Sequence, residues 1–233
     1  MARSLSRAVI GKYLGIVRAP FVPASLIPYC MGAALAARAG YAVRPDIFLI
    51  GLTGVVTAHL GGNLCNDYYD TLSGADSASP KISIFFGGSR AVSDGRAAAQ
   101  HIFGMALMFL GVAFFSALAA AVLTASVPLF AVSCLSGVLA FQYTAPPLCL
   151  SYRYGGEATI FLLFGAGIVC GSFFLFTGTV SSAVMIASLP VAFLITSVIV
   201  VNEVPDHRSD REAGKQNLVS LIRPERGYLL YGG

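Results

Sequence analysis

The chain has 233 residues, of which only 11% are charged and 56% are hydrophobic, whereas charged residues make up about 25% of a soluble globular domain. A soluble protein of this size needs more polar surface, and a disordered chain has fewer apolar residues. The composition excludes both classes and predicts an integral membrane protein, in which the few charges are expected to serve topology or function.

Six apolar segments follow one another along the chain, each near the length that a helix needs to cross a bilayer. We expect them at about 20–37, 46–65, 101–123, 127–143, 158–178 and 182–201. Their hydrophobicity is continuous rather than alternating, which indicates helices and not the strands of a barrel. The sequence therefore predicts a single all-α transmembrane domain over residues 1–233.

The charged residues are distributed unequally between the two sides of these segments. Of the 15 basic residues, 13 precede the first segment or follow the second, fourth or sixth, and only Arg38 and Arg44 lie on the other side. The positive-inside rule therefore predicts a multi-pass protein with a cytoplasmic N-terminus and cytoplasmic even-numbered loops. Ten of the 11 acids share that side, with Asp46 as the exception. Topology does not explain the acids, since they contribute little to orientation.

The first acidic cluster lies where the second apolar segment ends, in the stretch NLCNDYYD at 63–70, with Asp76 further along. Residues three and four apart share one face of a helix. If the helix continues through this stretch, Asn63, Asn66, Asp67 and Asp70 form one polar stripe.

The second acidic cluster ends the sixth segment, in the stretch NEVPDHRSD at 202–210. Asn202, Asp206 and Asp210 are spaced four residues apart and share a helical face. Two helices that are four segments apart are thus predicted to end in the same arrangement on the same side of the membrane.

Carboxylates that converge repel one another unless a positive charge lies between them. Oxygen ligands of this kind suit Mg²⁺, which commonly joins one or two carboxylates to substrate phosphates. Several basic residues on the same side are candidates for the phosphate: Lys81, Arg90, Arg153, Arg208 and Lys215. A single cluster would be interpreted as a solvated loop, but two with matched spacing favour a shared site for Mg²⁺ and a diphosphate.

The cysteines and histidines carry no comparable pattern. The five cysteines have no Cys-x-x-Cys spacing and are expected to be free thiols. His59 and His101 lie within or beside apolar segments, and we expect both to be satisfied helix residues rather than ligands.

At the two acidic clusters the sequence resembles the UbiA superfamily of intramembrane prenyltransferases. The first signature is the stretch NDYYD at 66–70 followed by Asp76, and the second is Asp206-x-x-x-Asp210 followed by Gly214-Lys215. The stretches YTAPPL at 143–148 and LSYR at 150–153 are similar to the family's loop after the fourth span. The spacing from Asp70 to Asp76 and the stretch GGSR at 87–90 resemble the menaquinone branch, whereas residues 202–205 depart from the usual second motif of that branch.

The resemblance implies a bundle of nine transmembrane helices around a cavity, with both motifs at its cytoplasmic mouth. This chain supplies six spans, so we expect it to be a truncated form. The implied activity is Mg²⁺-dependent transfer of a polyprenyl group from a polyprenyl diphosphate to an aromatic acceptor, and 1,4-dihydroxy-2-naphthoate is the acceptor favoured. The implied partners are these two substrates and the lipid bilayer, with no nucleic acid.

The resemblance also implies roles for individual residues. The expected metal ligands are Asn66, Asp67, Asp70, Asp76, Asp206 and Asp210. The diphosphate is expected to contact Asn66, Lys81, Arg90, Arg208 and Lys215. The residues expected to act in the reaction itself are Asp67, Asp70, Asp206, Asp210, Arg153 and Tyr143. Tyr68, Tyr69 and Tyr143 could face an allylic cation by cation–π attraction, and anchoring at the membrane interface is an equal alternative for these tyrosines.

Three alternatives stay open at this stage. The acceptor could be 4-hydroxybenzoate, a haem, a chlorophyllide or a glycerol phosphate. A CDP-alcohol phosphotransferase would also use Mg²⁺, but its contiguous motif is not found in this sequence. A cation transporter would place acids within the spans or at both mouths, whereas nearly all acids here lie on one side.

Overall fold

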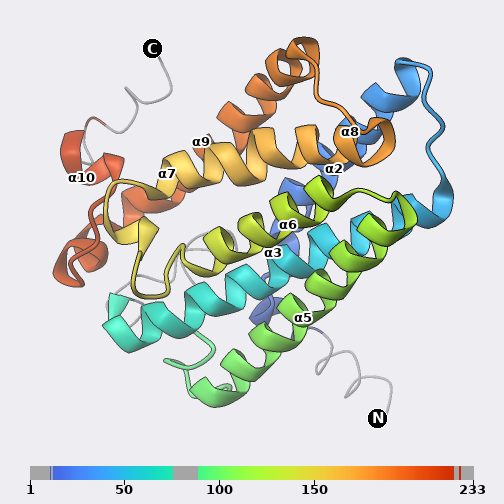
Figure 1. The fold of residues 1–233 in the computed structure, drawn as a ribbon. Coiled ribbons are helices and arrows are strands. Elements are labelled where there is room, and N and C mark those ends of the chain that lie inside the picture. The colour runs from blue at the N-terminus through green and yellow to red at the C-terminus, as the bar shows by residue number, and fades with distance from the viewer. Residues whose placement is uncertain (1–10, 12, 76–88, 223–225, 227–233) are drawn as a thin grey trace.

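The structure is a computed structural model that describes residue 11 and residues 13–75, 89–222 and 226. Within these residues it is helical and contains no strand, which confirms the predicted all-α class (Figure 1). Five stretches are long and apolar enough to cross a membrane: Ala19–Arg38, Pro45–Ser73, Ala99–Leu123, Gly156–Thr177 and Ser182–Glu212. The chain is therefore an integral, multi-pass membrane protein.

The helical elements follow one another in the order η1 (Ala19–Phe21), α2 (Pro23–Arg38), α3 (Pro45–Ser73), α5 (Ala99–Leu123), α6 (Val127–Phe141), η2 (Leu150–Tyr152), α7 (Gly156–Ile160), η3 (Phe161–Gly167), α8 (Ile168–Thr177), α9 (Ser182–Glu212) and α10 (Leu218–Ile222). The fourth of the six expected spans corresponds to α6, an apolar helix of 15 residues that is shorter than the five stretches named above.

Two helices run well beyond their expected ends. Hydrophobicity predicts ends near 65 and 201, but α3 continues to Ser73 and α9 to Glu212. Both acidic clusters therefore lie on helices, as the stripe interpretation requires. A glycine in the left-handed region follows each helix, Gly74 with φ 83° and Gly214 with φ 79°, since glycine adopts that backbone without steric cost.

Helix packing brings the two clusters to one end of the bundle. α3 and α5 form an antiparallel pair, and α2 packs against α8 (Figure 1). α9 crosses η3, a π-helical stretch, at Gly165, where an added Cβ would clash with the Cα of Ala192. Small residues allow membrane helices to approach this closely.

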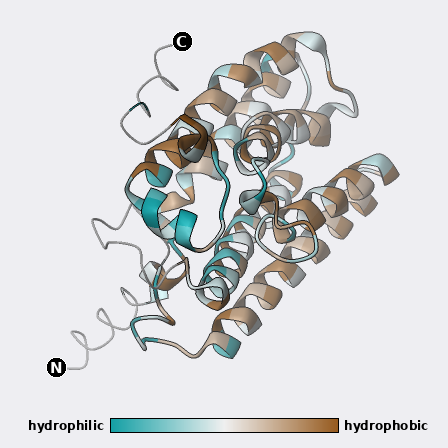
Figure 2. Ribbon diagram, turned by 90° about the vertical axis from the view of Figure 1, so that its left-hand side faces the viewer, coloured by the Kyte–Doolittle hydropathy of each residue, from teal (hydrophilic) through white to brown (hydrophobic). Residues whose placement is uncertain are grey.

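The bundle surface divides by polarity. The helix walls are largely hydrophobic, and hydrophilic residues gather at the helix ends (Figure 2). Large apolar side chains such as Phe115, Val122 and Val127 are mostly exposed, which suits contact with lipid. The C-terminal ends of α3 and α9 lie at the same end of the bundle as α7 and α10 (Figure 1).

Candidate active site

The polar faces of α3 and α9 converge on one pocket. α3 contributes Asn63, Asn66 and Asp70, and α9 contributes Asn202, Asp206 and Asp210. The pocket is lined in full by Arg18, Phe21, Ala24, His59, Gly62, Asn63, Asn66, Asp70, Ala75, Ala140, Tyr143, Ser151, Ile160, Phe164, Ile195, Val198, Ile199, Asn202, Glu203, Asp206, Asp210, Lys215 and Asn217. One end is thus polar, and the deeper part is mainly apolar.

Lys215 lies between the two acidic clusters. After α9, Gly214 N–H donates to Arg211 O at 3.1 Å, and Lys215 N–H donates to Asp210 O at 2.8 Å. This is the hydrogen-bond pattern of a Schellman turn, which folds the chain back over the last turn of a helix. The turn places Lys215 Nζ 2.7 Å from Asp70 Oδ2 and 3.6 Å from Asp210 Oδ1.

Asp70 is the most extensively bonded carboxylate of the site. Its Oδ2 also accepts from Asn66 Nδ2 at 2.9 Å, and its Oδ1 accepts from the Tyr152 hydroxyl at 2.8 Å. Burial opposes the charge on Lys215, but Asp70 and Asp210 outweigh it and raise the pKa of the Lys215 amine above its usual range. Burial, followed by the charge of Asp70, raises the pKa of the Tyr152 phenol. Lys215 therefore stays cationic and Tyr152 stays a hydrogen-bond donor.

A network of hydrogen bonds fixes the segment that carries Lys215. Tyr154 N–H donates to Gln216 O at 2.7 Å, and Asn217 Nδ2 donates to Asp210 Oδ2 at 3.2 Å. The buried carboxylate of Glu157, at the start of α7, accepts from Leu218 N–H at 2.5 Å. Residues 214–218 are thus held against the loop that precedes α7.

Asp67 turns away from its neighbours in the first cluster. It is only 3% exposed and is not among the pocket-lining residues. Its two carboxylate oxygens accept from Ser89 N–H at 3.1 and 3.2 Å, and Arg18 Nη1 lies 3.8 Å away. The predicted stripe is therefore split: three of its four members face the pocket, and Asp67 faces the 89–90 segment.

Arg18 is a pocket residue that sequence reasoning assigned only to topology. Its Nη1 donates to Asn66 Oδ1 at 3.4 Å, and its Nε is buried without a hydrogen-bond partner in the described part of the chain. The one signal in the sequence is its position directly before the first apolar segment, which does not separate a site residue from a topological charge. Glu203 and Asn217 also line the pocket and were not predicted.

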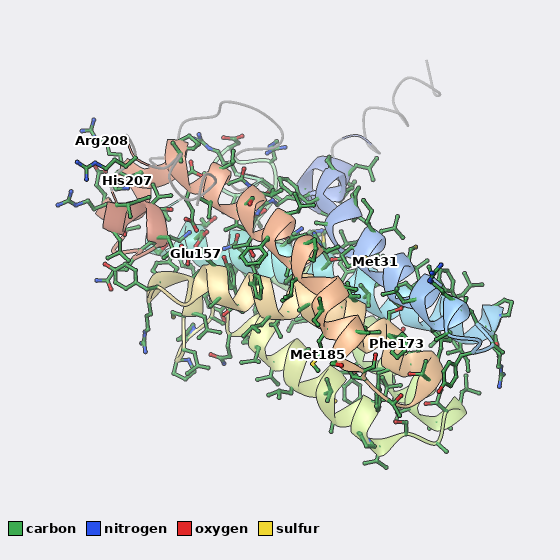
Figure 3. The ribbon with its side chains drawn as sticks, turned by 90° about the horizontal axis from the view of Figure 1, so that it is seen from above. Met31, Glu157, Phe173, Met185, His207 and Arg208 are labelled. Carbon is green, nitrogen blue, oxygen red and sulfur yellow. The ribbon has the colours of Figure 1, made fainter. Side chains whose placement is uncertain are left out.

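Three predicted arginines do not line the pocket. Arg90 pairs with Asp94 at 3.7 Å, and Arg153 is exposed and donates to Pro147 O at 3.2 Å. Arg208 is 93% exposed beside Glu212 and lies at the outer tip of the bundle (Figure 3). The helical extension of α9 explains why Arg208 points away from the pocket. Arg208 lies two residues from both Asp206 and Asp210, so its side chain leaves the helix on another face. Asp76 and Lys81 lie outside the described residues.

The structure places only some of the tyrosines that were predicted to face an allylic cation at the pocket. Tyr143 lines the pocket, and burial, followed by the charge of Glu203, raises the pKa of its phenol. Tyr68 and Tyr69 instead pack with each other and with Phe103, with ring centroids 5.0 Å and 4.7 Å apart for Tyr68–Tyr69 and Tyr68–Phe103. Only Tyr143 of the three faces the pocket.

The oxygen-bearing side chains at the polar end of the pocket are of the type that binds a hard cation. Asn66, Asp70, Asp206 and Asp210 offer oxygen ligands from two helices, which is the ligand type that Mg²⁺ prefers. Among the residues that the structure describes, no three His, Cys, Asp or Glu side chains are grouped closely enough to hold a metal ion. The Lys215 ammonium instead supplies the positive charge between Asp70 and Asp210.

Comparison with protein families and curated proteins gives consistent matches. The model of the UbiA prenyltransferase family matches residues 25–232. UbiA prenyltransferase domain-containing protein 1 from Mus musculus is 30% identical over 212 residues, which cover 89% of this chain and 60% of the relative. The 1,4-dihydroxy-2-naphthoate octaprenyltransferase of Bacillus subtilis is 28% identical over 89% of this chain and 64% of its own length. The chain thus spans less than two thirds of the length of these relatives.

Solved structures match over nearly the whole chain. A UbiA homolog from Archaeoglobus fulgidus, bound to GPP and Mg²⁺, has a TM-score of 0.73 at 19% sequence identity. The match covers 95% of this chain and 73% of that chain. The fold is therefore shared.

Proposed function

Because this chain belongs to the UbiA prenyltransferase family, we propose that it transfers a polyprenyl group from a polyprenyl diphosphate to an aromatic acceptor in a Mg²⁺-dependent reaction. The observation that carries the proposal is the convergence of Asp70 and Asp210, from helices far apart in sequence, on the single ammonium group of Lys215. Carboxylates that can bind Mg²⁺ beside a lysine that can bind phosphate are the groups that a site for a diphosphate and its counter-cation would use.

We propose that Asn66, Asp70, Asp206 and Asp210 hold Mg²⁺ together with oxygens of the diphosphate, which would supply the ligands that the carboxylates by themselves do not gather. Bound Mg²⁺ would supply charge neutralisation of the leaving diphosphate. The A. fulgidus homolog, which shares the fold and is bound to GPP and Mg²⁺, supports a site for a prenyl diphosphate and Mg²⁺ in this bundle. Asp67 would act indirectly, because it holds Arg18 beside Asn66.

The other polar groups of the pocket would act on the two substrates. Lys215 would bind the diphosphate and stabilise the negative charge that develops on it. The face of Tyr143 would stabilise the allylic cation by cation–π attraction. The apolar wall, which includes Ile160, Phe164 and Ile199, would receive the prenyl chain.

We propose 1,4-dihydroxy-2-naphthoate as the acceptor, with the B. subtilis relative in support. The ring carbon that bears the carboxylate would bond the allylic carbon, the bond to the diphosphate oxygen would break, and the carboxylate would leave as CO₂. The other acceptors considered above are the alternatives within the family. The polar end of the bundle, with the N-terminus, would face the cytoplasm, as the distribution of basic residues indicates.

The test combines binding and turnover. The chain in lipid nanodiscs is titrated with geranyl diphosphate at increasing Mg²⁺, and transfer of labelled polyprenyl diphosphate is then measured on a panel of aromatic acceptors by mass spectrometry. Asp70→Ala and Asp206→Ala should each abolish Mg²⁺-dependent binding and transfer. If both variants bind and transfer at near wild-type levels, the site assignment is wrong.

A further inference from the structure

The apolar part of the pocket contains one imidazole, that of His59. The side chain lies on α3 and is only 5% exposed. It shares the pocket-facing side of that helix with Asn63 and Asn66, in agreement with the three- and four-residue spacing of a helical face. Seven residues, or about 10 Å of helical rise, separate His59 from Asn66. His59 therefore lies deeper in the pocket than the acidic clusters.

The His59 ring is held firmly on one side. Its Nδ1 lies 2.6 Å from the buried Ser25 Oγ of α2. Its edge packs against the ring of Phe164, with centroids 5.4 Å apart and planes at 79°. The contacts come from α2 and η3, which fix the orientation of the imidazole relative to the pocket.

The other nitrogen of the ring has no such partner. His59 Nε2 is buried and forms no hydrogen bond with any residue that the structure describes. The sequence expectation that His59 is a satisfied helix residue therefore holds for Nδ1 only. A buried polar atom without a hydrogen bond is costly, so a side chain that lines a pocket in this state is suited to a ligand group that supplies the missing bond.

The chemistry of the pocket indicates which kind of ligand group could hydrogen-bond His59 Nε2. In a neutral imidazole Nε2 is a donor when Nδ1 accepts from Ser25, and an acceptor when Nδ1 donates. A hydroxyl group can pair with either form. Phe164 packs against the imidazole, and the same pocket is also lined by the apolar side chains Phe21 and Ile195, which favours a ring that carries the hydroxyl rather than a hydrated polar molecule.

We propose that His59 Nε2 hydrogen-bonds a ring hydroxyl of the aromatic acceptor, and that Ser25 is the positioning residue that orients the imidazole. The inference rests on the proposed function and names a contact within the same pocket. The ring would lie between His59 and the polar end, with its reacting carbon toward the diphosphate. A purely structural His59 would instead affect all pocket ligands equally.

The test compares two ligands that differ in their hydroxyl groups. 1,4-dihydroxy-2-naphthoate, kept anaerobic, and 2-naphthoate, which lacks both hydroxyls, are titrated against the full chain in nanodiscs. The chain contains no tryptophan, so naphthoate emission is recorded without tryptophan fluorescence. Wild-type protein should bind the dihydroxy compound more tightly than 2-naphthoate.

Substitutions at His59 then test whether this residue causes the difference in affinity between the two ligands. His59→Leu should weaken binding of 1,4-dihydroxy-2-naphthoate about five- to tenfold, the factor expected for one hydrogen bond, and leave that of 2-naphthoate within about twofold. His59→Gln, which keeps a hydrogen-bonding group, should restore part of the loss, and Ser25→Ala should give a smaller loss of the same selectivity. Thr53→Val, on the exposed side of the same helix, is the matched control.

The outcomes separate this inference from the proposed function. Equal weakening of both ligands in His59→Leu, no weakening of either, or no hydroxyl preference in the wild-type protein overturns the inference. A hydroxyl preference that depends on His59 without prenyl transfer to any acceptor upholds the contact and contradicts the proposed function. Prenyl transfer with an acceptor KM that His59→Leu leaves unchanged contradicts the contact alone.

Discussion

Lys215 Nζ lies 2.7 Å from Asp70 Oδ2, although the two residues are 145 positions apart in the chain. The contact joins the ends of α3 and α9, and Asp210 Oδ1 lies 3.6 Å from the same ammonium group. The lysine therefore balances two carboxylates that would otherwise face each other, and it lies where the proposed diphosphate would need a cation.

Replacing Lys215 should affect both stability and activity. Lys215→Met leaves Asp70 and Asp210 without their shared counter-charge, and removal of one partner of a buried ion pair costs about 3–5 kcal/mol. We expect a lower melting temperature in the absence of Mg²⁺ and prenyl transfer reduced about a hundredfold or more. Thermal melting in nanodiscs and single-turnover assays measure the two effects. Arg211→Met, which removes an exposed charge near the end of the same helix, should change neither.

Gly214 should matter through the position of Lys215. An alanine at φ 79° costs about 1–2 kcal/mol, and relief of that strain would rotate Lys215 away from Asp70. Gly214→Ala should therefore weaken Mg²⁺-dependent binding of geranyl diphosphate as well as stability. Gly40 also has a positive φ, 88°, and lies after α2 at the other end of the bundle. Gly40→Ala should lose similar stability and keep its binding, and equal binding losses in both would refute the positional argument.

Glu157 should hold the segment that carries Lys215. Glu157→Ala leaves Leu218 N–H without its buried acceptor, at a cost of about 1–3 kcal/mol. Glu157→Gln keeps an oxygen for that bond. We expect the alanine variant to lower the melting temperature and raise the concentration of geranyl diphosphate needed for half-saturation, with most of both effects restored in the glutamine variant. Equal defects in the two variants would show that the negative charge, not the hydrogen bond, is what matters.

The Mg²⁺ requirement should follow the carboxylates that line the pocket. Asp70→Asn and Asp210→Asn each remove one anionic oxygen ligand while keeping side-chain size. We expect the Mg²⁺ concentration for half-maximal binding of geranyl diphosphate to rise about tenfold or more in each. Asp46→Asn, an exposed acid paired with Arg44 at the other end of α3, supplies the control. If Asp70→Asn and Asp210→Asn show the same Mg²⁺ dependence as the control Asp46→Asn, Asp70 and Asp210 are not Mg²⁺ ligands.

The sequence by itself determined the membrane class, the apolar segments and the two acidic faces. Each of these depends on local information: the length of an apolar run, or the spacing of three and four residues on one helix. Hydrophobicity did not predict the extension of α3 and α9 through their acidic ends, and only the spacing of the acids pointed to it. The direction in which the Asp67 side chain points could not be inferred from the sequence. It depends on Ser89 and Arg18, which contact α3 from other segments.

Only the tertiary structure decided which charges meet. The sequence offered five basic residues for the diphosphate, and helix packing together with the turn at Gly214 brings Lys215 into the pocket while Arg208 stays exposed. The pairing of Ser25 with His59, from α2 and α3, has no local signature either. Contacts of this kind are set by how helices distant in sequence cross, which the pattern of a single segment does not encode.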